Sequence, residues 1–182
     1  MKNTKQIQIV VVAAVILVMG FLLFKPVSGL VTKEENSAET AATAASAEKF
    51  NLSSVSELSK RGLNPSIAQE ITDLEAKAEK AAGEEKINLY QQLAQKWNDV
   101  EKFAPQGYIY EEMAKISPNF EYWLNSGDAF RKGYTNLQDS TLATALNQKA
   151  LEVYQKALDL EGSSLQAKTG LGAAMVTGTN NP

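Results

Sequence analysis

The stretch "YWLNSGDAF", residues 122–130, places a glycine in the middle of a segment whose neighbours have helical spacing. A glycine inside a helix costs about 1 kcal/mol relative to alanine, so a helix retains one where the missing side chain brings an advantage. Trp123 stands four positions before Gly127, and Phe130 stands three positions after it. The spacing predicts a close contact between two helices at Gly127, with the two aromatic rings filling the space beside it.

The sequence on both sides of this stretch predicts further helices. Apolar residues recur there at spacings of three and four, as at Ile67, Ile71, Leu74 and Ala78. No segment of the sequence shows the period-two alternation that is typical of strands. We expect helices over about 64–83, 84–103, 105–116, a segment around 122–130, 141–160 and 163–177. The predicted fold class is therefore all-α.

Capping residues suggest where these helices begin and end. Asn64 can cap the first of them, Pro65 suits its first position, and Gly83 is expected to stop it. The pair Ala104-Pro105 is expected to end the second helix. A short helical turn is expected ahead of Asn64, at Phe50, Leu52, Val55 and Leu58.

The amino-terminal apolar segment is long enough to cross a membrane. Residues 7–24, "IQIVVVAAVILVMGFLLF", include one polar side chain, Gln8. As a helix this segment reaches about 27 Å, close to the thickness of a bilayer core. A cleaved signal peptide is the alternative, but its apolar region is usually shorter, and Lys25-Pro26 precede the only candidate cleavage site. We favour an uncleaved transmembrane anchor.

The charges around this segment predict its orientation. Lys2, Lys5 and the free amino group precede it, whereas Lys25 alone follows closely. The positive-inside bias therefore leaves residues 1–6 as a short cytoplasmic tail and exports the rest of the chain. In a bacterium, the protein would be a single-pass inner-membrane protein with its helical domain in the periplasm.

A tether is expected between the anchor and the helices. Residues 32–48 are rich in Ala, Ser, Thr and Glu and contain no aromatic or branched aliphatic residue. Such a segment buries too little apolar surface to order itself, although an exposed helix is the alternative. We expect a flexible tether over 25–63 and an α-helical domain over 64–182.

The helical region resembles itself at a separation of 44 to 45 residues. The aligned positions are Tyr110 with Tyr154, Ile116 with Leu160, Pro118 with Gly162, Gly127 with Gly172, and Phe130 with Met175. Self-similarity at such a period is the sequence signature of stacked helical repeats.

These positions resemble the tetratricopeptide repeat family, in which aromatic, Leu and small residues on one helix precede Ala, an aromatic and Pro on the next. The first copy has Tyr90, Leu93, Ala94, Trp97, Tyr110 and Pro118. The second has Trp123, Gly127, Phe130, Ala150, Tyr154 and Ala157, and the third has Ala167, Leu171, Gly172 and Met175. The resemblance covers about residues 87–178 and is most specific in "ALEVYQKALDLEG", residues 150–162, followed by "AKTGLG". It implies a right-handed helical solenoid with repeats at about 87–120 and 121–165 and an incomplete repeat at 166–182.

The sequence departs from the family pattern in three places. Gln106 stands where the family prefers Ala, and about 11 extra residues around 131–141 must lengthen the helices or the turn of the second repeat. The final "TGTNNP" resembles the beginning of another helix. We therefore expect a fragment of a longer repeat array, with a capping last helix as the alternative.

The composition excludes several kinds of chemistry. The chain has no Cys and no His, which excludes disulfides, thiolate nucleophiles, the usual zinc triads and Ser–His triads. After Pro26 there are 15 basic and 21 acidic residues, a poor balance for binding nucleic acid. We expect no enzyme activity, no catalytic residue, no cofactor and no metal site.

Three acid–lysine pairs stand at helical i,i+4 spacing: Glu111–Lys115, Asp128–Lys132 and Glu152–Lys156. Such pairs usually mark exposed helix faces, and we expect them to have no role in chemistry. Glu111 and its neighbour Glu112 are two carboxylates that could in principle act as a catalytic acid and base. Without a pocket signal, we expect this pair to be exposed as well.

The resemblance implies a binding protein. The repeat aromatics Tyr90, Trp97, Trp123, Phe130 and Tyr154 are expected in the core, and exposed contacts are expected at Tyr108, Phe120, Tyr122 and Tyr134. The family's concave face lies on the first helix of each pair, where the candidates are Asn88, Gln91, Gln95, Asn98, Asn125 and Arg131. The predicted function is a membrane-anchored, exported scaffold for a protein or peptide partner. The alternative is an envelope assembly factor or chaperone, such as a cytochrome c biogenesis subunit that holds apocytochromes.

Overall fold

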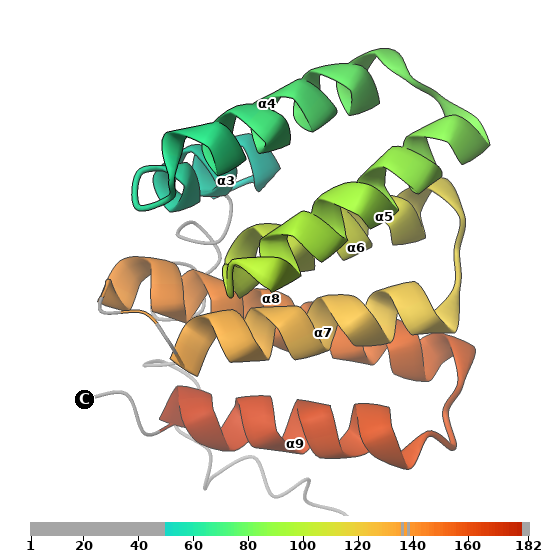
Figure 1. The fold of residues 1–182 in the computed structure, drawn as a ribbon. Helices are drawn as coiled ribbons and strands as arrows, with labels where there is room; N and C mark the ends of the chain where they lie inside the picture. Colours follow the sequence, from blue (N-terminus) through green and yellow to red (C-terminus); the bar gives the residue numbers. More distant parts are fainter. Residues whose placement is uncertain (1–49, 136, 138, 180–182) are drawn as a thin grey trace, which may run out of the picture. The chain divides into compact units, whose positions relative to one another are not determined.

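The computed structural model describes residues 50–135, 137 and 139–179, and this part of the chain contains seven helices and no strand (Figure 1). The helices are α3 (Leu52–Lys60), α4 (Pro65–Lys80), α5 (Gly83–Asp99), α6 (Phe103–Ile116), α7 (Phe120–Thr135), α8 (Ser140–Leu160) and α9 (Leu165–Thr179). The all-α prediction is confirmed for these residues. The predicted cytoplasmic tail, the anchor over 7–24 and most of the tether lie outside them. None of the described helices is long and apolar enough to span a membrane.

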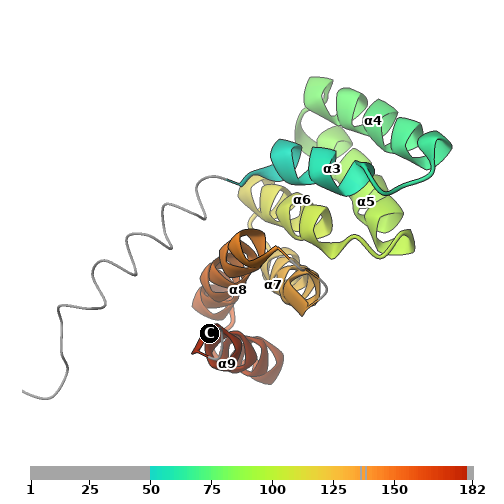
Figure 2. The same cartoon turned by 90° about the vertical axis from the view of Figure 1, so that its left-hand side faces the viewer.

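From α4 onward, each helix packs against the next helix in the chain, and short turns connect them. The amino-terminal helix α3 lies against α6 (Figure 2). Helix α3 therefore lies within residues 25–63, which were expected to form the tether, and the helical domain extends ahead of the boundary expected at Asn64. Helices that pack in chain order are compatible with a helical repeat protein.

Side-chain caps explain where three of the helices begin. Asn51 Oδ1 accepts a hydrogen bond of 2.9 Å from the Ser54 amide, and Ser54 Oγ accepts one of 3.0 Å from the Asn51 amide. Asn64 caps α4 as predicted, by accepting from the Ser66 amide. Asp139 accepts from the first amides of α8. Each cap pairs backbone donors that a helix start leaves without a partner.

Two predicted helix ends are wrong. Helix α4 ends at Lys80, and Gly83 begins α5 with a left-handed φ of 57°. Helix α5 ends at Asp99, because Glu101 takes a φ of 55° and the Lys102 amide donates to the Trp97 carbonyl across 3.0 Å. This closure usually uses glycine, so no residue in the sequence indicates it. Pro105, expected to end α5, instead lies in the first turn of α6, where proline is tolerated.

The buried apolar residues form two clusters that share α6. The first lies among α4, α5 and α6: Ile71, Ala78, Tyr90, Leu93, Ala94, Trp97, Ile109 and Met113. The second joins α3 to the helices from α6 to α9 and includes Val55, Tyr108, Trp123, Phe130, Leu146, Val153 and Tyr154. Both faces of α6 are consequently covered.

The five repeat aromatics are buried as predicted, whereas the prediction that Tyr108 is exposed is wrong. Tyr108 packs edge-to-face against Phe130, with ring centroids 4.9 Å apart. The other three expected contact aromatics, Phe120, Tyr122 and Tyr134, are half-buried against the second cluster. None of the four is a freely exposed ring.

The close contact predicted at Gly127 is confirmed. A Cβ placed on Gly127 would lie 2.6 Å from the ring of Tyr154 in α8. Gly170 of α9 packs against the same ring, so Tyr154 lies between two glycines. The expected equivalence of Gly172 is wrong, because a Cβ there would meet no described atom within 4 Å.

The residues around 131–141, expected as an insertion, form the end of α7, the connection to α8 and the beginning of α8. Helix α7 continues to Thr135, and α8 begins at Ser140 and is 21 residues long. Leu137, in the turn, is half-buried against the second apolar cluster. Leu137 therefore extends the second apolar cluster into this connection.

Candidate functional site

The six predicted concave-face residues fall into two groups. Four polar side chains are exposed along one face of α5: Asn88, Gln91, Gln95 and Asn98. The Gln95 amide donates to Asp99 across 2.6 Å. Asn125 and Arg131 are half-buried on α7. The main packing partners of α5 are α4 and α6, and those of α7 are α6, α8 and α9.

Arg131 lies close enough to Tyr154 to affect the pKa of its phenol. The Tyr154 hydroxyl donates to Asp128 across 2.6 Å. Burial and then the Asp128 carboxylate raise the pKa of Tyr154 above its ordinary value, while Arg131 acts in the opposite direction. The phenol therefore stays protonated and remains a donor.

Asp128 was expected to pair with Lys132, but no such ion pair is found among the described residues.

A cavity of about 420 Å³ lies beside the chain that leads into α3, between α6 and α8. Its walls are formed by Phe50, Asn51, Leu52, Tyr108, Glu111, Glu112, Lys115, Gln148, Lys149 and Glu152. The volume lies within the range of small-ligand sites in proteins. Residues from three separate parts of the chain therefore form one charged hollow.

Glu111 is the central acid of this hollow. Its side chain is only 2% exposed, and Oε1 accepts from Lys115 Nζ at 3.0 Å and from Lys149 Nζ at 2.9 Å. Oε2 is buried and has no hydrogen-bond partner in the described part of the chain. The predicted Glu111–Lys115 pair is confirmed, but its exposure is wrong, because α8 brings Lys149 over the carboxylate.

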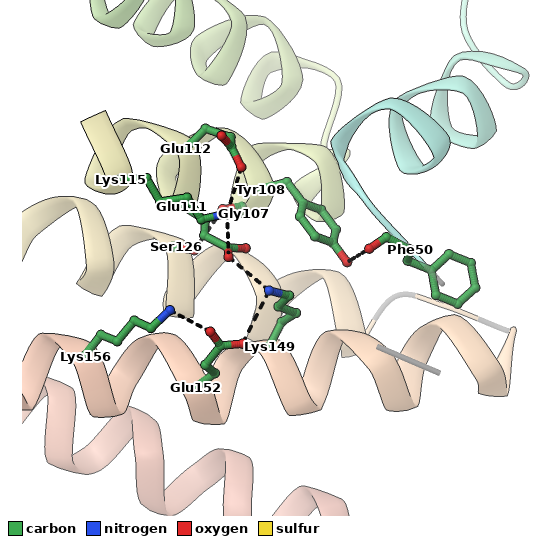
Figure 3. A network of polar contacts seen from close by, with 10 residues as sticks. All are labelled: Phe50, Gly107, Tyr108, Glu111, Glu112, Lys115, Ser126, Lys149, Glu152 and Lys156. Atoms are coloured by element: carbon green, nitrogen blue, oxygen red, sulfur yellow. Dashed lines mark hydrogen bonds and ion pairs between the residues drawn. The ribbon is translucent and has the colours of Figure 1, made fainter. Parts of the chain in front are cut away.

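The ion pairs continue from Glu111 in both directions (Figure 3). Lys115 also reaches Glu112 at 2.8 Å, and Lys149 also reaches Glu152 at 3.3 Å. Lys156 completes the line by pairing with Glu152 at 2.6 Å, as the sequence predicted. Partial burial alone would raise the pKa of Glu152, but the hydrogen bond from Lys156 and the charge of Lys149 outweigh it and hold this pKa below its ordinary value.

Tyr108 forms the uncharged wall of the cavity. Its hydroxyl donates to the Phe50 carbonyl across 3.3 Å, which connects α6 to the chain entering α3 (Figure 3). Burial, followed by the charges of Glu111 and Glu152, raises the pKa of Tyr108 above its ordinary value. The hydroxyl therefore remains neutral beside the two acids.

A second hollow of about 420 Å³ is lined by residues of α3, α4, α5 and α6. Its floor is apolar and includes Ala78, Tyr90, Leu93 and Ile109. Lys60 at its rim pairs with Glu57 at 2.6 Å and with Glu75 at 2.8 Å. Leu52, the first residue of α3, lines both hollows, and charged residues line the second hollow as well: Glu57, Lys60, Glu75, Glu79 and Lys86.

Sequence reasoning did not find Glu111 as a site residue. Its partner Lys149 is 38 residues away, and only the packing of α8 on its neighbours brings the two together. Among the described residues, no group of three acidic side chains could hold a metal ion. Comparison of this chain with family models, with curated proteins and with solved structures gives no match, so the tetratricopeptide assignment stays a prediction.

Proposed function

We propose that this chain is a membrane-anchored, exported scaffold of the tetratricopeptide type. It binds a protein or peptide partner through the surface of its helices and catalyses no reaction. The observation that carries this proposal is the pair of hollows that share Leu52 of α3, each of about 420 Å³ and each lined by residues of several helices. A preformed surface of this kind binds a segment of polypeptide without first having to order itself.

The repeat assignment is supported by packing that the pattern anticipated. The five repeat aromatics are buried, and Gly127 lies directly against Tyr154 of the following helix. Gln106, which stands where the repeat family prefers Ala, has a structural role. Its buried side-chain amide donates a hydrogen bond to the Ala94 carbonyl across 3.2 Å. Each of the last two contacts joins the two helices of one predicted repeat.

The membrane part of the proposal depends on sequence alone. Residues 7–24 and the lysines around them lie outside the described residues, and their hydropathy and charge are the support. Reporter fusions placed after residue 24 test the orientation. An exported reporter is expected, and a cytoplasmic reporter would reverse the topology.

Site-specific photo-crosslinking in native membranes tests partner binding. A photoreactive residue is introduced in the full chain at Gln91 on α5 or at Gln148 beside the charged hollow. Asp73, exposed on α4, is the matched control position. We expect one defined polypeptide adduct from at least one of the first two positions and none from Asp73. The absence of adducts from all three positions would contradict the scaffold proposal.

A further inference from the structure

Helix α3 is attached to the other helices by few buried side chains. It has nine residues, whereas the other described helices have between 14 and 21. Val55 and Ser56 are its buried residues, and Leu58 is 41% exposed. A helix of this length is marginal in water without packing, so α3 depends on its contacts with the neighbouring helices.

Hollows border α3 and reduce the packing around it. The two hollows of about 420 Å³ both have Leu52 in their walls. A third hollow, of about 80 Å³, has Ser59 in its wall. Atoms beside a hollow lack the neighbours that close packing provides, so α3 gains less dispersion energy than a helix on a filled surface.

Polar bonds provide the other contacts of α3. Ser56 Oγ and Lys60 Nζ both donate to the Glu75 carboxylate of α4, the second across 2.8 Å. Lys60 also donates to the Thr72 hydroxyl across 3.2 Å. Water replaces such bonds when a helix is released, so their net contribution to stability is modest. With few buried apolar contacts, α3 belongs to the part of the fold that opens first.

The surface under α3 suits a short amphipathic helix. Leu52 lines one hollow with the buried ring of Tyr108, and it lines the other with the buried side chain of Ile109. Glu75 at the edge of the second hollow accepts a lysine. An apolar floor with an acid at its edge matches a helix that has an apolar face and a basic residue near its end.

We propose that α3 is a detachable helix that covers a binding surface on α4 and α6, and that a short amphipathic helix of the partner polypeptide takes its place. The partner helix presents a branched aliphatic residue where α3 presents Val55, and a lysine where α3 presents Lys60. The inference rests on the proposed function, because it takes the displacing helix to belong to the partner of the scaffold. It adds a means of regulation, since the partner binds only when α3 is released.

Cysteine labelling of the full chain in detergent micelles tests the release of α3. The chain has no Cys, so an introduced cysteine is its single thiol. Val55→Cys and Val153→Cys make the same change at two residues that are both 0% exposed. We expect iodoacetamide to label the Val55→Cys protein at least tenfold faster than the Val153→Cys protein. Equal rates would show that α3 opens only when the whole domain opens, and would overturn the inference.

Peptide binding tests the surface under α3. The probe is a fluorescent peptide with the sequence of residues 50–61, FNLSSVSELSKR, and the control peptide has aspartate at the position of Val55. In the wild type, the α3 of the chain itself competes with the probe. Val55→Asp in the full chain removes this competitor, so the probe should bind at least tenfold more tightly than it binds the wild type.

A milder variant keeps this test decisive if Val55→Asp fails to fold. Lys60→Ala removes the bonds from α3 to Glu75 and Thr72 and leaves the surface on α4 intact, so the probe should bind at least threefold more tightly than to the wild type. Lys77→Ala makes the same change at an exposed residue of α4 and should have no effect. Equal affinity for wild type and variants, or equal binding of the control peptide, would place the probe elsewhere and overturn the inference.

The outcomes separate this inference from the proposed function. A photo-crosslinked partner together with equal labelling rates would leave the scaffold standing and overturn the release of α3. Fast labelling and binding of the probe without any crosslinked partner would support the release of α3 and overturn the scaffold. Absence of the crosslinked partner, of fast labelling and of probe binding would overturn the two proposals together.

Discussion

The helices from α6 to α9 approach one another through glycines, whereas those from α3 to α5 meet through large side chains. In the carboxy-terminal region, Gly107 packs against the ring of Phe130, and Gly127 and Gly170 pack against the ring of Tyr154. The two glycines of the amino-terminal region, Gly62 and Gly83, lie in turns or at a helix start and have no described atom within 4 Å of a placed Cβ. Its contacts are made by side chains such as those of Trp97 and Leu93.

The two kinds of contact predict which substitutions each region tolerates. A ring packed directly on a backbone leaves no room for an added methyl group, so small-to-large changes are the sensitive ones there. A contact made of large side chains leaves a cavity when one is truncated, so large-to-small changes are the sensitive ones. The following predictions test this contrast, beginning with the largest effect.

Trp97→Ala should cause the largest loss of stability. Trp97 is 0% exposed and belongs to the first apolar cluster, among α4, α5 and α6. Its truncation leaves a cavity that costs about 3–5 kcal/mol of stability. Urea unfolding of the full chain, followed by circular dichroism, measures this loss. Leu165→Ala, at a residue that is 79% exposed, is the control and should shift stability by no more than about 0.5 kcal/mol. Equal losses of stability in the two variants would show that the first apolar cluster does not stabilise the fold through Trp97.

Gly127→Leu should destabilise the protein by about 1–3 kcal/mol or more, because the new side chain must displace the buried ring of Tyr154. Gly172→Leu is the matched control on α9, where a placed Cβ meets nothing described within 4 Å. This control should be neutral or slightly stabilising, since leucine has the higher helix propensity. A melting curve of Gly127→Leu that coincides with that of the wild type would remove the basis of the contrast.

Tyr154→Phe should cost about 1.5–3 kcal/mol, because the lost hydrogen bond goes to the Asp128 carboxylate across 2.6 Å. Tyr108→Phe loses a 3.3 Å bond to a neutral carbonyl and should cost about 0.5 kcal/mol. Thermal unfolding of both variants under the same conditions measures the difference. A larger loss from Tyr108→Phe would show that the connection to α3 matters more than the contact among α7, α8 and α9.

Acidification should reveal the smallest effect, at Glu152. Its pKa lies below the ordinary value of 4.5 in the folded protein, so the ionised form stabilises the fold above that value. This contribution is lost as the pH falls through the folded-state pKa. The side chain is 46% exposed, so the contribution should be under about 1 kcal/mol.

Glu152→Gln therefore should lose less stability than the wild type between about pH 5 and pH 3. Stability at several pH values, measured by urea unfolding, provides the comparison. Parallel pH profiles for the two proteins would mean that Lys149 and Lys156 do not favour the ionised form.

Helix existence could be predicted from the sequence because apolar spacing and cap residues are local signals. These signals predicted that one helix begins at Asn64 and another near Thr141, and both predictions are confirmed. The end of α5 at Asp99 could not be predicted, since Glu101, a left-handed acidic residue, takes the place of the usual glycine. Gly83 was assigned to a helix end because its sequence signal is the same whether it closes one helix or opens the next.

The charged hollow could not be predicted because its residues are distant in sequence. The i,i+4 spacing of Glu111 and Lys115 indicates an ion pair correctly, but it does not show that a third helix covers the pair. Gly127 was recognisable because its cost within a helix requires a compensating contact, and Gly170 was missed because Gly172 occupies the expected register. Local signals therefore located the helices, and burial depended on contacts between them.

The position of α6 between the two apolar clusters has a consequence for amide exchange. Ile109 and Met113 belong to one cluster, whereas Tyr108 and Ala114 belong to the other. Opening of either region alone uncovers one side of this helix and leaves the other side packed. The amides of α6 should therefore exchange with solvent deuterium more slowly than those of α4 or α9, and only when both regions open together.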